Sequence, residues 1–153
     1  MTGSTSFADL GVGVQTVQGL EAAGIKAPFP VQTMVIPDAI SGRDILVQSP
    51  TGSGKTLAFA IPIVERLDPT VDAPRALILV PTRELASQVV EEFRMLVGER
   101  LRVAAVYGGL GLVRQAKEAT HSHIIVATPG RLNDLVQRRM LDLQDIETLV
   151  LDE

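Results

Sequence analysis

A lysine and a threonine follow two closely spaced glycines in residues 49–56, which read Ser-Pro-Thr-Gly-Ser-Gly-Lys-Thr. Small residues let backbone N–H groups converge on phosphate oxygens, and a helix N-terminus adds partial positive charge. We expect Gly52 and Gly54 to shape this turn. The Lys55 ammonium would then reach the terminal phosphates of a nucleotide, and the Thr56 hydroxyl would bind Mg²⁺. The segment is therefore predicted to be a phosphate-binding loop.

The flanks of this segment decide between two interpretations. The general pattern has glycine six residues before the lysine, where this chain has Ser49, and the alternative is a turn that only caps a helix. An apolar, strand-like run at 45–48 precedes the loop, and a helix-like run from Leu57 follows it. This context favours the phosphate site.

Two adjacent carboxylates, Asp152 and Glu153, follow the apolar run 149–151. Beside a phosphate loop, Asp152 would hold Mg²⁺, commonly through water, and Glu153 would position or deprotonate the attacking water. An acidic pair taken alone is more often a solvated turn, but the loop favours the metal site. We therefore predict Lys55, Asp152 and Glu153 as the catalytic residues.

The elements that must position these residues alternate between apolar strand-like runs and amphipathic helical runs. This pattern predicts an α/β fold in which a parallel sheet carries helices on both faces. The predicted strands are residues 45–48, 76–80, 103–107, 124–127 and 149–151, and the predicted helices are 7–23, one from about Pro30, 56–67, 84–96, 113–119 and 131–137. Polar or glycine-rich segments follow every strand, so we expect them to share one edge of the sheet.

Two arginines, Arg83 and Arg131, lie in the first turns of predicted helices, where a cation opposes the helix dipole. Their placement suggests an anion such as a phosphate backbone. Thr82 and Thr128 before them suit simple N-caps, with Pro129 at a first helical position. Capping and anion binding are both kept as interpretations.

Three other features have two interpretations each. Two prolines fix the backbone before Gln32, whose amide fits the N6/N7 edge of adenine. Without this setting, a glutamine near a helix start would simply be a capping residue. Gly108 and Gly109 form either a plain turn or a place where a nucleic-acid strand approaches the main chain closely. Phe7 is a hydrophobe of a small cluster, with base stacking as the less favoured alternative.

Taken in order, these segments resemble the first RecA-like domain of the DEAD-box RNA helicases over nearly all 153 residues. Residues 24–32 resemble the Q motif, residues 49–56 motif I, residues 81–86 motif Ia, residues 108–109 with Gln115 the GG motif, residues 128–131 motif Ib, and residues 152–153 the first half of the DEAD motif. Phe7 stands where the family places an adenine-stacking aromatic. Departures are Phe29 in place of Thr or Ser, Ser49 in place of Ala, and the uncommon Pro50.

The resemblance implies ATP and Mg²⁺ as cofactors and RNA as a partner that is contacted without reading its sequence. The implied ATP-binding residues are Phe7, Gln32, Thr51, Gly52, Ser53, Gly54, Lys55 and Thr56, with Thr56 and Asp152 at the metal. The implied RNA-binding residues are Pro81, Thr82, Arg83, Gly108, Gly109, Thr128, Pro129, Gly130 and Arg131.

The family's pattern continues beyond Glu153, so we expect residues 1–153 to be a truncated N-terminal RecA-like domain. The missing second RecA-like domain would supply an arginine finger and half of the RNA clamp. The expected function of the longer protein is ATP-dependent unwinding of short RNA duplexes, with little activity for this chain alone. The alternatives are a nucleotide- or partner-binding module, or a DNA translocase of a neighbouring family.

Composition limits other possibilities. The net charge of −4 means that nucleic-acid contacts must come from a few locally placed cations, and the absence of cysteine excludes disulfides and thiolate metal sites. The longest apolar stretch, residues 57–64, is far shorter than the roughly 20 residues of a membrane span. With no secretory signal visible, we expect a cytoplasmic protein without a membrane partner.

Overall fold

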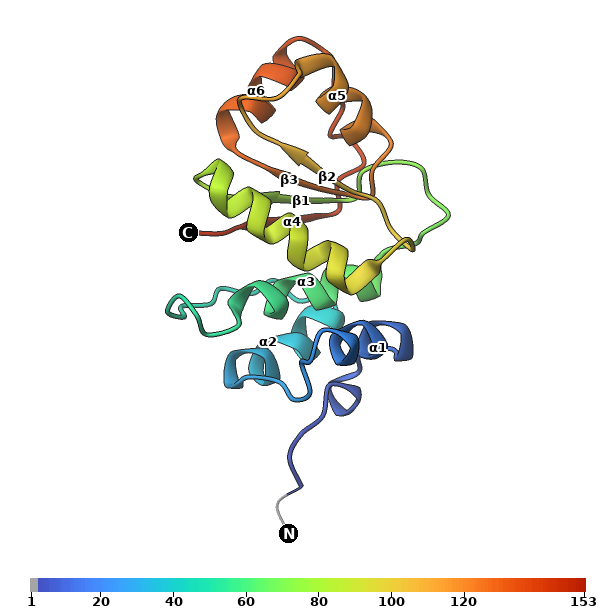
Figure 1. Cartoon of the computed structure of the whole chain (residues 1–153), viewed down its shortest axis with the longest axis vertical. Coiled ribbons are helices and arrows are strands. Elements are labelled where there is room, and N and C mark those ends of the chain that lie inside the picture. The colour runs from blue at the N-terminus through green and yellow to red at the C-terminus, as the bar shows by residue number, and fades with distance from the viewer. Residues whose placement is uncertain (1–2) are drawn as a thin grey trace. The chain divides into compact units, whose positions relative to one another are not determined.

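The computed structural model describes residues 3–153 as two compact units. The first contains the chain up to Arg66 together with Met95–Gly98, and the second contains Leu67–Arg94 and Glu99–Glu153. Figure 1 follows the chain from the helices of the first unit, in blue to green, into the strands and helices of the second.

The first unit is helical, with a short 3₁₀ helix η1 (Ala8–Leu10) and helices α1 (Val14–Ala22), α2 (Pro30–Ile40) and α3 (Lys55–Arg66). Helix α2 packs along α3. The Glu65 carboxylate of α3 accepts hydrogen bonds from the Gly13 N–H at 3.1 Å and from the hydroxyl of buried Thr16, and so caps α1. The predicted single helix 7–23 is wrong, because Gly11 adopts a left-handed conformation (φ 92°) that ends η1 before α1 begins.

The second unit is built on four parallel strands: β1 (Ala76–Leu79), β2 (Val103–Val106), β3 (Ile124–Ala127) and β4 (Thr148–Leu151). Their order across the sheet is β2-β3-β1-β4. The strands are aligned end to end, since Leu79 pairs with both Ala127 and Leu151, and Val106 also pairs with Ala127. All four predicted strands of this unit are confirmed.

Helices cover both faces of this sheet, as predicted. Figure 1 shows α5 (Leu112–Thr120) and α6 (Pro129–Gln137) on one side and α4 (Arg83–Val97), up to its Arg94 turn, on the other. The core beneath α5 and α6 is aliphatic, with members Leu77, Ala104, Val106, Ala116, Ala119, Ile125, Ala127, Leu132, Leu135 and Leu141. Both central strands are almost fully buried, as the apolar runs of a two-sided parallel sheet require.

The predicted strand at 45–48 is not formed. These residues are irregular, and Leu46 is 101% exposed. The side chains of residues 45–48 suit a sheet, which is why a strand was predicted. A strand forms only when a neighbouring strand accepts its hydrogen bonds. Within residues 3–153, no helix combines the length and apolar character needed to cross a membrane.

Candidate functional site

The loop at 49–56 has the glycine geometry that a phosphate-binding turn needs. Gly52 and Gly54 have φ angles of 82° and 85°, the left-handed region that glycine adopts without strain, and Lys55 begins the 12-residue helix α3. Ser49, which replaces the expected glycine, shares a 2.5 Å hydrogen bond with the Ser53 hydroxyl. The hydroxyl of Ser49 therefore links the start of the loop to Ser53 near its end.

Gln32 ties this loop to helix α2. Its Nε2 donates to the Gly54 carbonyl at 3.0 Å, and its Oε1 accepts the Phe29 N–H at 2.9 Å. The side chain is 2% exposed, and a Cβ on Gly54 would lie 2.5 Å from both Gln32 Nε2 and Phe29 Cδ2. The capping interpretation of Gln32 is thus confirmed. Reading of adenine stays a prediction and would use the second N–H and second lone pair of the amide.

Phe7 lies among the buried residues of the first unit at 3% exposure. Its carbonyl accepts hydrogen bonds from the Leu10 and Val12 N–H groups, which fixes the backbone at Phe7. The burial of Phe7 agrees with the hydrophobic interpretation, and stacking on adenine stays a prediction.

In the second unit, four of the segments singled out in the sequence follow the four strands. Because the strands are parallel and in register, their carboxyl ends meet at one edge. Along this strand-end edge the order is residues 108–109 after β2, 128–131 after β3, 81–83 after β1 and 152–153 after β4. The predicted RNA-binding residues are therefore brought together, whereas Lys55 and Thr56 belong to the other unit.

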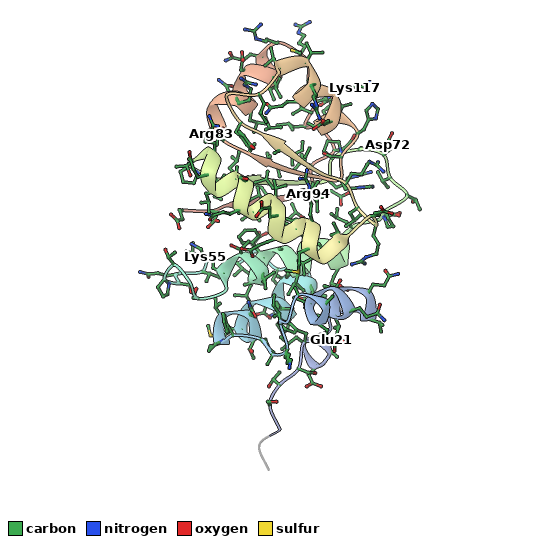
Figure 2. All side chains as sticks on the ribbon, in the orientation of Figure 1. Glu21, Lys55, Asp72, Arg83, Arg94 and Lys117 are labelled. Atoms are coloured by element: carbon green, nitrogen blue, oxygen red, sulfur yellow. The ribbon has the colours of Figure 1, made fainter. Side chains whose placement is uncertain are left out.

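Arg83 reaches across this edge from the start of α4. Its guanidinium carbon lies 5.9 Å from the centre of the Tyr107 ring, within cation–π range. Gly109 has a φ of 94°, which favours glycine, and a Cβ there would stand 2.9 Å from Arg83 Nη1, so the guanidinium lies directly against this residue. Arg83 is exposed, labelled in Figure 2, and held close to the glycine pair.

Arg131 is held by a buried amide. Its Nη1 donates to the Leu110 carbonyl at 2.9 Å and to Gln115 Oε1 at 3.1 Å. Gln115, which is 2% exposed, also donates from Nε2 to the Tyr107 carbonyl at 2.9 Å. One buried side chain thus fixes the end of β2, the loop after it and the first turn of α6.

Thr82 and Thr128, the two predicted N-caps at this edge, differ in whether the side chain makes the capping hydrogen bond. The Thr82 hydroxyl accepts the Leu85 N–H at 3.2 Å, so Thr82 caps α4. Thr128 occupies the N-cap position of α6 and Pro129 its first position, but the Thr128 side chain makes no capping hydrogen bond. The predicted N-cap position of Thr128 is therefore confirmed, although its backbone carbonyl, which accepts the Leu132 N–H, makes the capping contact in place of its hydroxyl.

Two glycines at the strand-end edge have no packing reason to be glycine. A Cβ on Gly108 or Gly130 would meet nothing within 4 Å, and neither residue has a positive φ. Because these glycines lack a side chain and face open space beside Arg83 and Arg131, the sugar-phosphate backbone of a nucleic acid could approach their main chain closely. The N-termini of α4 and α6 at the same edge add partial positive charge.

Asp152 is 6% exposed, and its N–H donates to the Leu79 carbonyl at 3.0 Å. Burial raises the pKa of Glu92 on α4, and the negative charge of Asp152 raises it further. Within residues 3–153, His, Cys, Asp and Glu nowhere gather in the threes that an all-protein metal cage needs. A buried carboxylate such as that of Asp152 fits Mg²⁺, which keeps several waters and takes its remaining ligands from substrate phosphates.

Two residues that organise this edge received no role from sequence reasoning. Gln115 was noted only as part of a motif, and Tyr107 only as the end of a strand. Tyr107 is the single tyrosine of the chain and precedes the glycine pair, which was a usable signal. The burial of Gln115 on α5 had no counterpart in the local sequence.

The sequence and the fold were compared with known proteins. The profile described as DEAD/DEAH box helicase matches residues 29–153. RNA helicase CrhR of Synechocystis is 47% identical over 98% of this chain, and the DEAD-box ATP-dependent RNA helicase CshA of Bacillus cereus is 41% identical over 97%. This chain spans only 31% and 29% of their respective lengths.

A solved structure of a DEAD box protein from the hyperthermophile Methanococcus jannaschii superposes with a TM-score of 0.92 at 37% identity. The match covers 97% of this chain and 41% of that protein. This likeness confirms the RecA-like α/β fold. With the aligned strand ends, the glycine loop and the family profile in agreement, the chain belongs to the DEAD/DEAH box helicase family.

Proposed function

We propose that this chain is the N-terminal, ATP-binding RecA-like domain of a longer ATP-dependent RNA helicase. The observation that carries the proposal is the row of glycines and arginines at the strand-end edge, where Arg83 and Arg131 are held beside bare main chain. Such a surface contacts the sugars and phosphates of RNA and therefore binds RNA independently of its base sequence. Relatives named as RNA helicases support RNA over DNA as the substrate.

The nucleotide would be held by the first unit. Backbone N–H groups of Thr51–Gly54 and the Lys55 ammonium would bind the phosphates, and Gln32 and Phe7 would face the adenine. Mg²⁺ held by Thr56 and Asp152 would neutralise charge on the phosphates. Glu153 would orient the attacking water and accept its proton.

The proposed activity needs a second RecA-like domain, because this chain spans about a third of its helicase relatives. That domain would complete both the ATP site and the RNA clamp, and cytoplasmic RNA would be its substrate. Hydrolysis of ATP by the longer protein should rise when single-stranded RNA is added. Equal rates with and without RNA, or stimulation by DNA alone, would contradict the proposal.

For this chain by itself, nucleotide binding without turnover is the second candidate, supported by the intact loop at 49–56. Calorimetric titration with Mg²⁺ and either ADP or GDP tests both the site and the base preference. We expect ADP to bind more tightly, since the Gln32 amide matches the adenine edge. Comparable affinities for ADP and GDP would contradict a base-reading role of Gln32 but would still agree with the phosphate site.

A further inference from the structure

A basic cavity of about 630 Å³ lies in the second unit, away from the strand-end edge. Its wall carries four cationic side chains, Arg94, Arg102, Arg114 and Lys117, and a single carboxylate, Glu118. The chain as a whole has a net charge of −4, so this local excess of positive charge is not a general property of its surface. Figure 2 labels Arg94 on α4 and Lys117 on α5.

Two of these cations have carboxylate partners that a ligand could replace. Arg114 pairs with Glu118 at 2.9 Å and Arg102 pairs with Asp72 at 2.8 Å, and all four side chains are more than half exposed. Exposed ion pairs contribute little free energy, so exchange for a phosphate costs little.

The other two cations lack a carboxylate partner within residues 3–153. Arg94 donates from Nη2 to the Val103 carbonyl at 3.3 Å, and Lys117 is exposed on the outer face of α5. Their charge is available to an anion in solution.

The cavity lies at the opposite end of the strands from the glycine pair. Val103 begins β2, which rises about 13 Å over its four residues before Gly108-Gly109. Along α4, Arg94 is eleven residues from Arg83, or about 16 Å. A stacked strand advances about 3.4 Å per nucleotide, so roughly five nucleotides connect the two places.

We propose that this cavity is a second contact for the phosphate backbone of single-stranded RNA, which leaves the strand-end edge and continues along the second unit. The inference rests on the proposed RNA-binding function. The guanidinium fork suits phosphate oxygens. The wall is lined mainly by cationic side chains, and the imidazole of His121 is its single ring, so phosphate contact outweighs base stacking there. RNA already held at the edge reaches the cavity as an intramolecular contact, which needs little intrinsic affinity.

An acidic peptide is the less favoured occupant. Peptides commonly add to an edge strand such as β2 through its free carbonyls. Here the outward carbonyls of Val103 and Tyr107 already accept hydrogen bonds from Arg94 and Gln115. Strand addition would have to displace both side chains.

The test compares oligo(U) of about 4 nucleotides, which is too short to connect the edge with the cavity, with oligo(U) of about 20 nucleotides, which reaches both. Fluorescence anisotropy at about 50 mM salt would measure both affinities for this chain and for the double variant Arg94→Gln/Lys117→Gln. We expect the long RNA to bind the double variant about tenfold more weakly, with a salt slope lower by about 1.4, while the short RNA changes less than about twofold.

Three further variants serve as checks. Asp72→Asn frees Arg102 from its partner and should strengthen binding of the long RNA only. Arg138→Gln/Arg139→Gln removes the same charge at the exposed end of α6 and should leave both affinities within about twofold. Lys117→Gln alone should leave the fold intact, because the Lys117 side chain makes no hydrogen bond or ion pair within residues 3–153. This single variant should still bind the long RNA severalfold more weakly.

Unchanged binding of the long RNA, an equal loss for both lengths, or an equal loss in the Arg138/Arg139 control would overturn the inference. So would Lys117-dependent binding of poly-glutamate without any effect on RNA, which would assign the cavity to an acidic peptide. If binding of the short RNA still depends on Arg83, the proposed function survives such a result. If the unmodified chain binds neither RNA, the proposed RNA binding and this inference both fail.

Discussion

The guanidinium of Arg131 and the buried amide of Gln115 are joined by a 3.1 Å hydrogen bond, and the same amide donates to the Tyr107 carbonyl at 2.9 Å. Gln115 lies on α5, while Arg131 opens α6 and Tyr107 follows β2. Gln115 therefore sets the position of Arg131, a residue proposed to contact RNA. The orientation of Arg131 should depend on α5 as much as on its own helix.

Gln115→Leu should lower both stability and RNA affinity. The substitution leaves the Tyr107 carbonyl unsatisfied and removes a partner of Arg131, at a cost of about 1–3 kcal/mol in unfolding free energy. Urea unfolding and RNA anisotropy measure the two effects. Gln137→Leu, at the exposed end of α6, is the matched control and should stay within about 0.5 kcal/mol. Equal stability of the two variants would contradict the role of Gln115.

Alanine substitutions at three glycines should form a graded series. Gly54→Ala meets Gln32 and Phe29 at 2.5 Å in a left-handed conformation, and should destabilise most and abolish nucleotide binding. Gly52→Ala has the strained φ of 82° but open space, with an expected cost of about 1–2 kcal/mol. Gly3→Ala has neither problem and should be neutral. Thermal unfolding with calorimetric ADP titration would reveal any other order, which would contradict the loop geometry.

Tyr107→Phe and Tyr107→Ala should differ in RNA binding. The phenylalanine ring keeps the cation–π contact with Arg83, whereas alanine removes it, at about 0.5–1 kcal/mol or up to about fivefold in affinity. Short oligo(U) is the ligand to use, because it reports on the strand-end edge alone. If both variants lose the same affinity, the hydroxyl and not the ring face is responsible.

Acid should remove a contribution of Asp72 to stability. A hydrogen bond from His121 lowers the pKa of Asp72, and the charges of His121 and Arg102 add to the effect. Because the folded-state pKa is depressed, the contribution is present above the ordinary value of 3.8 and disappears as the pH falls through the lowered pKa.

Urea unfolding between about pH 3 and pH 7 measures this effect. The stability difference between the unmodified chain and Asp72→Asn should be small at neutral pH, since the carboxylate is fully exposed, and should shrink at the acid end. A difference that grows in acid has the wrong sign for a depressed pKa.

The helices and the four paired strands were predictable, because each has a strong local pattern. Pro129 at the start of α6 and the apolar runs of β1 and β3 are local signals of this kind. Residues 45–48 carry the same apolar signal but form no strand, since strand formation depends on a partner that no local pattern specifies. Gly11 was missed as a break because a lone glycine is also tolerated inside helices.

For the site, motif residues were predictable in identity but not in contacts. Gln32 was expected either to read a base or to cap a helix, and the structure adds a contact to Gly54 that neither interpretation included. The basic cavity could not be predicted, because Arg94, Arg102 and Lys117 come from α4, the residue before β2 and α5, and meet only through folding. Residues 138–139, the most obvious cationic pair, end a helix at the surface.

Strand β4 has a consequence for handling this protein. It forms one border of the sheet, and Leu149 and Leu151 are 58% and 71% exposed. An open border with apolar side chains is a template on which a second copy can add its own strand, so the chain should self-associate as its concentration rises. Leu149→Lys places a charge there and should raise the concentration at which the protein begins to aggregate.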